Sequence, residues 1–349
     1  MDNMISRRAA VKGFATCAAG VFLPLLSSCA RDTKNRARLQ QPWVNDAEFI
    51  GYFMAAKRGY YRDEGLAAEN MEGGPDIVPE LVTRKGNAEI CLTTPDNTFA
   101  LIAKQGMALR IIGAQYQKSP MGIISLGPSG IREPRDLIGK RVAVPSVNTL
   151  TFETFLRLNN IIPDQVLVQP YNYDPTPLVD GNVDATLDFV TNVAYTVETL
   201  IRNRLTQKQA VAGTTDPDKC TVSSFLLADK GFPLLMDTVV VTESYLRDNR
   251  SILKSWLRAS RRGWQEVFKD PESAVKEIMP QYLPKTQRQL ELEISFCRRE
   301  QPLIDNPAGI FHMSQESIRQ TITSLSYMGI NGRQEEYFDN SLVEELERA

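Results

Sequence analysis

Carboxylate and aromatic side chains gather where the sequence predicts strand ends that lead into helices. Neither lysine nor arginine accompanies the five acidic residues in these turns, which are Asp46, Glu48, Asp96, Asp188 and Asp237. Carboxylates accept hydrogen bonds from N–H groups and aromatic faces stack on flat rings, so this composition favours a neutral or cationic heterocycle. An anion is usually clamped by Arg or Lys, but backbone N–H groups could still cradle one, so an anionic ligand is the alternative.

Four segments supply the candidate ligand-binding residues, because ligands of open α/β sheets sit beyond the carboxyl ends of the strands. They are Trp43, Asn45, Asp46, Glu48 and Tyr52; Thr93, Thr94, Asp96 and Asn97; Ser146, Asn148 and Thr149; and Asp188, Phe189, Thr191 and Asn192, with Asp237 opposite. Each segment also has a purely structural alternative. Trp43 could be core, the second and third segments could only cap helices, and the fourth could be a solvated turn.

The elements that must position these residues alternate along the chain, which predicts an α/β fold. Strands are expected at residues 88–93, 108–114, 121–126, 141–144, 166–169, 185–189 and 238–242, and helices at 49–62, 97–104, 149–158, 193–203 and 244–268. The last 80 residues are predicted to be mostly helical, with turns at Asp270-Pro271, Met279-Pro280 and Asn306-Pro307.

Composition excludes several classes of function. A formal net charge of -2 over 349 residues gives no electrostatic basis for binding nucleic acid. The single histidine, His312, makes a Ser-His-Asp triad or a histidine-rich metal site improbable, and neither a metal nor a cofactor is expected. Cys91, Cys220 and Cys297 lack metal-like spacing and are predicted to be buried thiols, not a disulfide framework.

The N-terminus predicts export and lipidation. Arg7 and Arg8 precede a short apolar run that ends in Leu26-Ser27-Ser28-Cys29, as in twin-arginine signals that finish in a lipobox. Residues 1–29 are therefore expected to act as an export signal, with the Cys29 thiol receiving a lipid that anchors the protein to a membrane. The alternative, a transmembrane helix, would need about 20 uninterrupted apolar residues. Residues 30–40 are polar and are expected to form a tether.

Several segments together resemble a known family. They are residues 43–66, Gly-Gly-Pro-Asp at 73–76, residues 135–145, the Asp-Pro-Thr-Pro run within 174–185, and residues 237–242. In this order they resemble the periplasmic solute-binding proteins of ABC importers, of the nitrate, sulfonate, taurine and thiamine-pyrimidine type. The Gly-Gly-Pro-Asp and Asp-Pro-Thr-Pro runs are most similar to the subgroup that handles thiamine pyrimidine precursors and riboflavin.

The resemblance implies a periplasmic binding protein fold of type II, with two doubly wound α/β lobes joined by two crossover segments and a ligand held between them. Lobe one would comprise residues 41–120 plus 237–349, lobe two residues 121–222, and a return hinge residues 223–236. It implies a monomeric, exported lipoprotein that captures a small-molecule solute, a thiamine pyrimidine precursor or a riboflavin-like compound, and delivers it to an ABC permease with its ATPase. Nitrate, taurine or an alkanesulfonate is the alternative solute.

Some relatives in the wider family are enzymes that make the thiamine pyrimidine. That chemistry needs a lysine for the imine and a histidine four residues later, and this chain has Thr93 and Asn97 at the matching positions. The cysteine-rich run of those enzymes is also absent at 233–237, where the sequence reads Pro-Leu-Leu-Met-Asp. Binding without catalysis is therefore expected.

Overall fold

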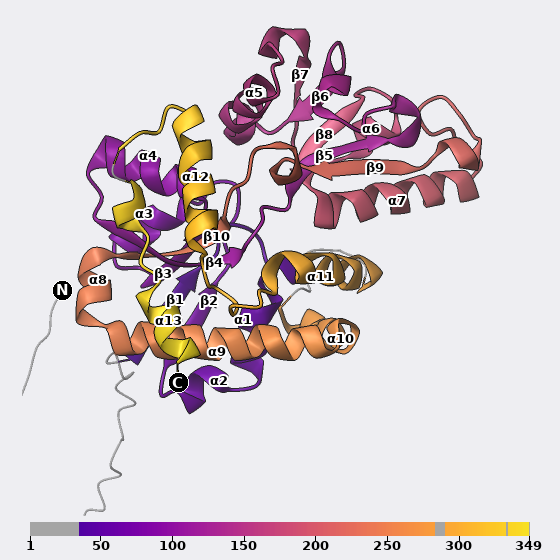
Figure 1. Ribbon diagram of the computed structural model, residues 1–349. Coiled ribbons are helices and arrows are strands. Elements are labelled where there is room, and N and C mark those ends of the chain that lie inside the picture. Colours follow the sequence, from indigo (N-terminus) through magenta and orange to yellow (C-terminus); the bar gives the residue numbers. More distant parts are fainter. Residues whose placement is uncertain (1–34, 283–289, 333, 349) are drawn as a thin grey trace, which may run out of the picture. The chain divides into compact units, whose positions relative to one another are not determined.

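Ten strands form two five-stranded sheets in the part of the chain that the structure describes (Figure 1). The structure is a computed structural model and describes residues 35–282, 290–332 and 334–348. All of these residues belong to one compact unit of the chain. The predicted export signal and lipidation site, with Arg7, Arg8 and Cys29, lie outside the described residues.

The first sheet has the strand order β2-β1-β3-β10-β4. Its strands are β1 (Arg36–Gln40), β2 (Ala67–Met71), β3 (Ile90–Thr93), β4 (Leu109–Tyr116) and β10 (Met236–Thr242). β1 pairs in parallel with β2 and β3, whereas β10 runs antiparallel between β3 and β4. Since β3, β4 and β10 are buried almost throughout, their sequences are largely continuous apolar runs.

The second sheet has the strand order β7-β6-β8-β5-β9. Its strands are β5 (Met121–Leu126), β6 (Arg141–Val144), β7 (Leu167–Pro170), β8 (Ala185–Phe189) and β9 (Val222–Leu226). β6 pairs in parallel with β7 and β8, and β5 is antiparallel to both β8 and β9. Each sheet is thus a parallel α/β sheet with one strand that runs the other way.

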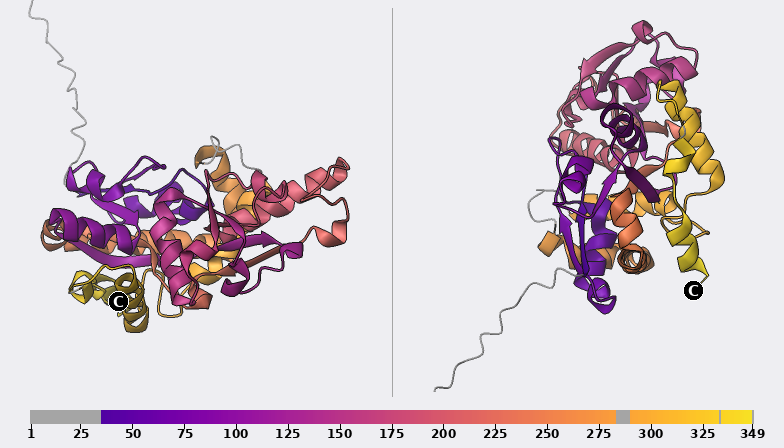
Figure 2. Two further views of the ribbon diagram at one scale, coloured as in Figure 1. Left: turned by 90° about the horizontal axis from the view of Figure 1, so that it is seen from above. Right: turned by 90° about the vertical axis from the view of Figure 1, so that its left-hand side faces the viewer.

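Helices from both ends of the chain surround the first sheet. We call the first sheet and its helices the first lobe, and the second sheet and its helices the second lobe. The first-lobe helices are α1 (Ile50–Lys57), α2 (Tyr60–Asp63), α3 (Pro79–Arg84), α4 (Pro95–Gln105), α8 (Glu243–Asp248), α9 (Arg250–Lys269), α10 (Pro271–Tyr282), α11 (Leu290–Ile304), α12 (Gln315–Tyr327) and α13 (Ser341–Glu347). The second-lobe helices are α5 (Thr149–Leu158), α6 (Thr176–Val179) and α7 (Val190–Thr206). In Figure 2 the indigo N-terminal elements lie beside orange helices from the last third of the chain.

Two glycines allow α1 and α9 to pack closely in the core of the first lobe. A Cβ atom at Gly263 would lie 2.1 Å from the Gly51 carbonyl oxygen, and one at Gly51 would lie 2.2 Å from Cδ2 of Trp264. Tyr52 of α1 stacks on Trp256 of α9 with ring centroids 5.7 Å apart, and both rings are fully buried. The apolar side of the amphipathic helix α9 therefore packs against this core.

Two crossing segments, residues 117–120 and 227–235, join the sheets. Because β10 is antiparallel to β4 and Met236 pairs with Tyr116, both crossings meet the first sheet at one edge. Met121 pairs with Phe189, and β9 ends at the same edge, so both crossings also meet one edge of the second sheet. β1, β3 and β4 end at the first of these edges, and β6, β7 and β8 end at the second. The crossings therefore connect the two carboxyl edges.

Contacts also tie the crossings and the lobes together. The ammonium of Lys118 lies 2.7 Å from the Asp229 carboxylate, which pairs one crossing with the other. Between the lobes, the guanidinium of Arg299 on α11 lies 3.1 Å from the Glu198 carboxylate on α7 and 5.8 Å from the centroid of the Tyr195 ring.

The structure corrects three expectations. The tether predicted at residues 30–40 is wrong for 36–40, which form β1 because Ala37 and Leu39 enter the core and the strand pairs with β2 and β3. The return hinge predicted at 223–236 is wrong at both ends, because residues 223–226 belong to β9 and pair with β5, and Met236 is the first residue of β10. The turn expected at Met279-Pro280 is wrong, because Pro280 lies inside α10.

The three cysteines of the described region, Cys91, Cys220 and Cys297, are free and buried, as predicted. Among the described residues, none of the helices combines the length and apolar character needed to cross a bilayer.

Candidate ligand-binding site

The turn after β1 carries the first group of candidate residues. Asp46 begins a short 3-10 helix, Ala47–Phe49, and one of its carboxylate oxygens accepts a hydrogen bond of 3.0 Å from the backbone N–H of Glu48. The backbone N–H of Ala47 donates to Oε2 of Glu293 on α11, at 2.9 Å. Because the helix starts with these acceptors, both acidic side chains of the turn, Asp46 and Glu48, point inward and are buried.

Five carboxyl groups form what we call the acid cluster: Asp46, Glu48, Asp237, Glu293 and Glu300. Each has an exposed fraction of 5% or less. They come from three separate elements, namely the turn after β1, the first residues of β10, and α11. The chain thus brings carboxyl groups nearly 250 residues apart to one buried place at the carboxyl edge of the first sheet.

Amide and phenol donors connect the acid cluster. The side-chain amide of Gln115 donates to the Glu48 carbonyl oxygen at 2.9 Å and to Oδ2 of Asp237 at 3.4 Å. The hydroxyl of Tyr116 donates to Oε1 of Glu300. Gln115 and Tyr116 are the last residues of β4, so this strand contributes donors to the edge where β10 contributes Asp237.

Burial raises the pKa values of three carboxyl groups in the cluster, Glu48, Asp237 and Glu300. For Glu48, burial and the nearby Asp237 and Asp46 raise the pKa well above its usual value. Burial raises the pKa of Asp237 to about 7, although its hydrogen bond with Glu48 acts in the opposite direction. The pKa of Glu300 is likewise raised well above its usual value, first by burial. A buried charge without a counter-charge is costly, so the cluster retains protons near neutral pH. Glu48 is protonated and donates a hydrogen bond to the Asp237 carboxylate.

Asp237 occupies a strained position. Its φ angle is +47°, in the left-handed region that residues other than glycine rarely adopt. This conformation costs about 1 kcal/mol or more and is tolerated here inside a well-packed sheet, at the start of β10. It is one of the features that cluster at binding and catalytic sites.

Aromatic side chains connect this edge with the second lobe. The ring of Trp43 lies 4.9 Å, centroid to centroid, from that of Tyr173, and the Tyr173 ring lies 5.7 Å from that of Tyr171. Both tyrosines follow β7, so Trp43 belongs to the first lobe and its partners to the second. We call these three residues the aromatic row.

The end of β8 lies near both groups. The Asp188 carboxylate raises the pKa of Tyr173, after the larger effect of burial, and one of its oxygens accepts the Phe189 N–H at 2.7 Å. The Phe189 ring meets the ring of Tyr116 edge-on at 6.2 Å. Residues of the fourth predicted segment therefore contact the first lobe through Phe189.

The structure thus brings together some of the predicted residues. Asp46, Glu48 and Asp237 share the acid cluster, Trp43 belongs to the aromatic row, and Asp188 and Phe189 adjoin both. Asn45 lies in the same turn, where its backbone N–H donates to Oε1 of Glu72 at 3.2 Å. Tyr52 lies deeper, because its ring is part of the α1–α9 core.

The other predicted residues make local contacts. The Thr93 hydroxyl donates a hydrogen bond of 2.7 Å to the Glu80 carboxylate, and Thr94 precedes α4. In the first turn of α4, burial raises the pKa of Asp96, and Asn97 is exposed. The Thr149 hydroxyl donates to the Ser146 carbonyl oxygen at 3.0 Å, beside Asn148 at the start of α5. Thr191 is buried in the first turn of α7, and the carbonyl of Asn192 accepts from Thr196.

Sequence reasoning missed six residues of this region: Gln115, Tyr116, Tyr171, Tyr173, Glu293 and Glu300. Tyr171 and Tyr173 obey the strand-end rule used for the other turns, since they follow the predicted strand 166–169. Glu293 and Glu300 are seven residues apart, which places them on one helix face. That spacing is visible in the sequence, but the sheet edge it faces is not.

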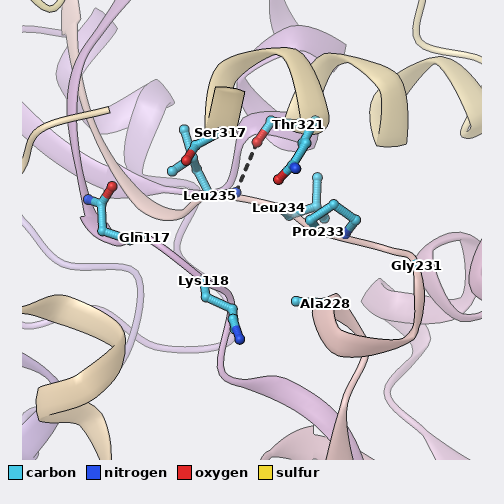
Figure 3. A pocket seen from close by; sticks show the side chains of 10 residues that line it. Gln117, Lys118, Ala228, Gly231, Pro233, Leu234, Leu235, Ser317 and Thr321 are labelled. Carbon is cyan, nitrogen blue, oxygen red and sulfur yellow. Dashed lines mark hydrogen bonds between the residues drawn. The ribbon is translucent and has the colours of Figure 1, made fainter. Parts of the chain in front are cut away.

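Two pockets lie near this region. One, of about 240 Å³, lies between the two crossings and α12, with Gln117 and Lys118 on one side and Ser317 and Thr321 on the other (Figure 3). The Thr321 hydroxyl accepts the backbone N–H of Leu235 at 3.0 Å. The other, of about 210 Å³, lies in the second lobe and includes Tyr171 of the aromatic row. No group of side chains in the described ranges is arranged to hold a metal ion.

Two mixed sheets, two crossings and functional groups at the joined carboxyl edges define the fold of periplasmic solute-binding proteins. The chain belongs to the NMT1/THI5-like family, whose model matches residues 46–274. The predicted fold and the predicted family are thereby confirmed.

Known relatives and a solved structure support this assignment. The chain is 22% identical to the riboflavin-binding protein RibY of Chloroflexus aurantiacus over 265 residues, which is 74% of this chain and 69% of the relative. It is 30% identical over 110 residues to a 4-amino-5-hydroxymethyl-2-methylpyrimidine phosphate synthase of Legionella pneumophila, which is 31% of this chain and 34% of the relative. The periplasmic aliphatic sulphonate binding protein SsuA of Escherichia coli has a similar fold, with a TM-score of 0.60 at 12% identity, covering 84% of this chain and 91% of that protein.

Proposed function

We propose that this chain is the exported, lipid-anchored substrate-binding protein of an ABC importer. It holds a flat nitrogen-containing heterocycle, of the thiamine pyrimidine precursor or riboflavin-like class, between its lobes and passes it unaltered to the permease. The protein works as a monomer, and the lipid on Cys29 keeps it at the membrane surface.

The observation that carries the proposal is the acid cluster beside the aromatic row. A heterocycle with ring nitrogens and amino groups offers N–H donors and a face that can stack. The turn after β1 supplies carboxyl oxygens that accept from the N–H groups and an aromatic ring, Trp43, that stacks on the face. No lysine or arginine is among the groups that shift the pKa values of Glu48, Asp237 and Glu300 in the described region. An anionic solute at this place would lack a counter-charge, which disfavours nitrate, taurine and alkanesulfonates.

One relative supports this proposal, and another leaves a second role to distinguish. The printed name of the RibY relative describes riboflavin binding, and that of the Legionella relative describes a synthase. Synthesis is disfavoured here because Thr93 and Asn97 stand where the resembling enzymes need a lysine and a histidine. The Thr93 hydroxyl is buried and already bonded to Glu80, so it offers no amine and no exposed nucleophile.

Thermal unfolding tests the ligand class. The mature protein, purified in detergent from membranes, should melt at a higher temperature with an aminopyrimidine precursor or with riboflavin, because a ligand that binds only the folded state stabilises it by RT ln(1 + [L]/Kd). Taurine and an alkanesulfonate serve as comparisons. A shift with the sulfonates and none with either heterocycle would refute the assignment.

Membrane anchoring needs a separate test. The variant Cys29→Ser should be released from the membrane fraction, whereas Cys220→Ser, which alters a buried thiol of the second lobe, should stay membrane-bound. Mass spectrometry of the N-terminal peptide should show a diacylglyceryl group on Cys29. An unmodified Cys29 in protein recovered from the cytosol would contradict the proposal.

A further inference from the structure

The second-lobe pocket lies beside three neighbouring strands, β6, β7 and β8. It is lined by Ala143 of β6, Pro170 and Tyr171 at the end of β7, and Thr186 of β8, and it is closed by the segment that leads into α6. Its volume of about 210 Å³ has room for several non-hydrogen atoms. We call it the side pocket.

The side pocket has a rigid frame and neutral polar groups. Pro170, Pro175 and Pro177 line it, and their fixed φ angles limit how far it can collapse. The Tyr171 hydroxyl is buried, near Asp188 and Thr186, without a hydrogen bond of ordinary geometry. A ligand group that bonds this hydroxyl with good geometry would therefore stabilise the complex.

Other polar groups of the side pocket accept hydrogen bonds or donate only weakly. The Thr186 hydroxyl reaches the Ala143 carbonyl oxygen at 3.4 Å, which is long for a hydrogen bond. Asp174 accepts the Thr176 N–H through Oδ1 at 2.9 Å, and Asn172 is exposed at the rim. The lining includes no lysine or arginine. A chain of hydroxyl groups matches these partners, whereas a phosphate would meet Asp174 without a compensating cation.

The side pocket shares Tyr171 with the aromatic row. Tyr171 lines the pocket and its ring contacts the ring of Tyr173, which in turn contacts Trp43 of the first lobe. A ligand whose ring lies against Trp43 and Tyr173 can therefore extend a substituent past Tyr171.

We propose that the side pocket binds a neutral, hydroxylated side chain of the solute, while the flat ring of the same solute lies in the aromatic row. This inference rests on the proposed function and narrows it to heterocycles that carry a polyol chain and no phosphate. A bare aminopyrimidine has no substituent long enough to fill the pocket.

Three flavins separate the parts of the ligand. Riboflavin carries the polyol chain, lumiflavin has the same ring system with a methyl group in its place, and flavin mononucleotide adds a terminal phosphate. Titration of the mature protein, followed by quenching of flavin fluorescence, should rank riboflavin at least tenfold tighter than either of the others.

Two variants connect this ranking with the side pocket. Tyr171→Phe removes only the hydroxyl and should weaken riboflavin about fivefold, the size expected for one hydrogen bond, while lumiflavin affinity stays unchanged. Asn172→Phe places a ring at the rim and should reduce riboflavin binding at least tenfold. The matched control is Asn203→Phe on the exposed side of α7, which should bind all three flavins as the parent does. Circular dichroism verifies that each variant is folded.

The outcomes separate the inference from the proposed function. Equal affinity for riboflavin and lumiflavin, with no effect of Asn172→Phe, would overturn the side-pocket inference and leave heterocycle binding intact. Binding of an aminopyrimidine but of no flavin would also overturn the side-pocket inference and leave heterocycle binding intact. Failure of every heterocycle to bind would refute the proposed function itself.

Discussion

At the scale of single residues, Asp237 links the site to pH. Burial raises its pKa to about 7 in the folded protein, against a usual value near 3.8. At pH values between about 4 and 7, Asp237 is protonated in the folded chain and ionised in the unfolded chain. Its stabilising effect is therefore complete below about pH 4 and disappears as the pH rises through 7.

Asp237→Asn should flatten the dependence of stability on pH. One proton of difference corresponds to about 1.4 kcal/mol in unfolding free energy per pH unit, so the variant should lose up to that much slope between pH 5 and 7. Asparagine also tolerates the left-handed backbone at this position. Urea unfolding at pH 5, 6, 7 and 8 measures the effect.

Asp184→Asn is the matched control for that experiment. Its hydrogen bond with Arg141 lowers the pKa of Asp184, so this carboxyl titrates below the tested window and its removal should leave the slope unchanged. An unaltered slope in Asp237→Asn would show that Asp237 is already ionised at pH 5.

Trp43 supplies an optical signal for the site. Of the three tryptophans, Trp256 and Trp264 are fully buried in the α1–α9 core, whereas Trp43 is half-buried in the aromatic row. Contact with the ligand should therefore shift the emission maximum of Trp43 and leave those of Trp256 and Trp264 in place. Trp43→Phe should abolish the ligand-induced change, and Trp43→Ala should weaken binding about tenfold, because a lost aromatic contact costs about 0.5–1.5 kcal/mol beyond the area it buries. A full ligand-induced change in Trp43→Phe would place the ligand elsewhere.

Residue types at strand ends predicted part of the site. Asp46 and Glu48 were identified in the segment that precedes the predicted helix at 49–62, and Asp237 because it precedes the predicted strand at 238–242. The structure places the three together. Glu293 and Glu300 were not, because their position depends on how α11 packs against a turn almost 250 residues earlier. Local sequence carries no information on such packing.

At the scale of elements, α1 and α9 are in close contact through Gly51 and Gly263. Gly263→Ala would place a methyl group 2.1 Å from a backbone oxygen of α1, which no side-chain rotation can relieve. We expect the free energy of unfolding to fall by about 1–3 kcal/mol, despite the better helix propensity of alanine. Chemical denaturation measures this loss.

Gln265→Ala, two residues further along α9 at an exposed position, is the matched control and should change stability by less than about 0.5 kcal/mol. Equal stability of the two variants would mean that the helices separate easily, and the α1–α9 packing would then not define the core of the first lobe.

Element prediction succeeded where burial leaves a strong pattern. β5 and β6, together with α5, occupy the predicted residues, because apolar runs and helical spacing were both visible there. β2 was missed since Ala-Ala-Glu-Asn-Met has no β-branched or aromatic residue and lies at the edge of its sheet. β9 was missed for a similar reason, as Val-Ser-Ser-Phe-Leu is also an edge strand. Such edge strands form because they pair with a neighbouring strand, and local sequence does not show that pairing.

At the scale of the whole molecule, the two crossings place both carboxyl edges at one junction. Hinge motion of two lobes about two short segments is a common way to enclose a ligand, and closure is a change that a permease can recognise. The contacts between Trp43 and Tyr173 and between Arg299 and Glu198 are those that closure would preserve or strengthen. The arrangement suits a protein that holds a solute and releases it.

The proposed function requires that this protein retain a flat nitrogen-containing solute and leave it chemically unaltered. Mass spectrometry of small molecules released from the freshly purified mature protein, repeated after hours of incubation with the identified solute, tests it directly. We predict one bound heterocycle per chain, recovered quantitatively and unchanged. Conversion of the solute into a product, or recovery of a sulfonate in its place, would contradict the account.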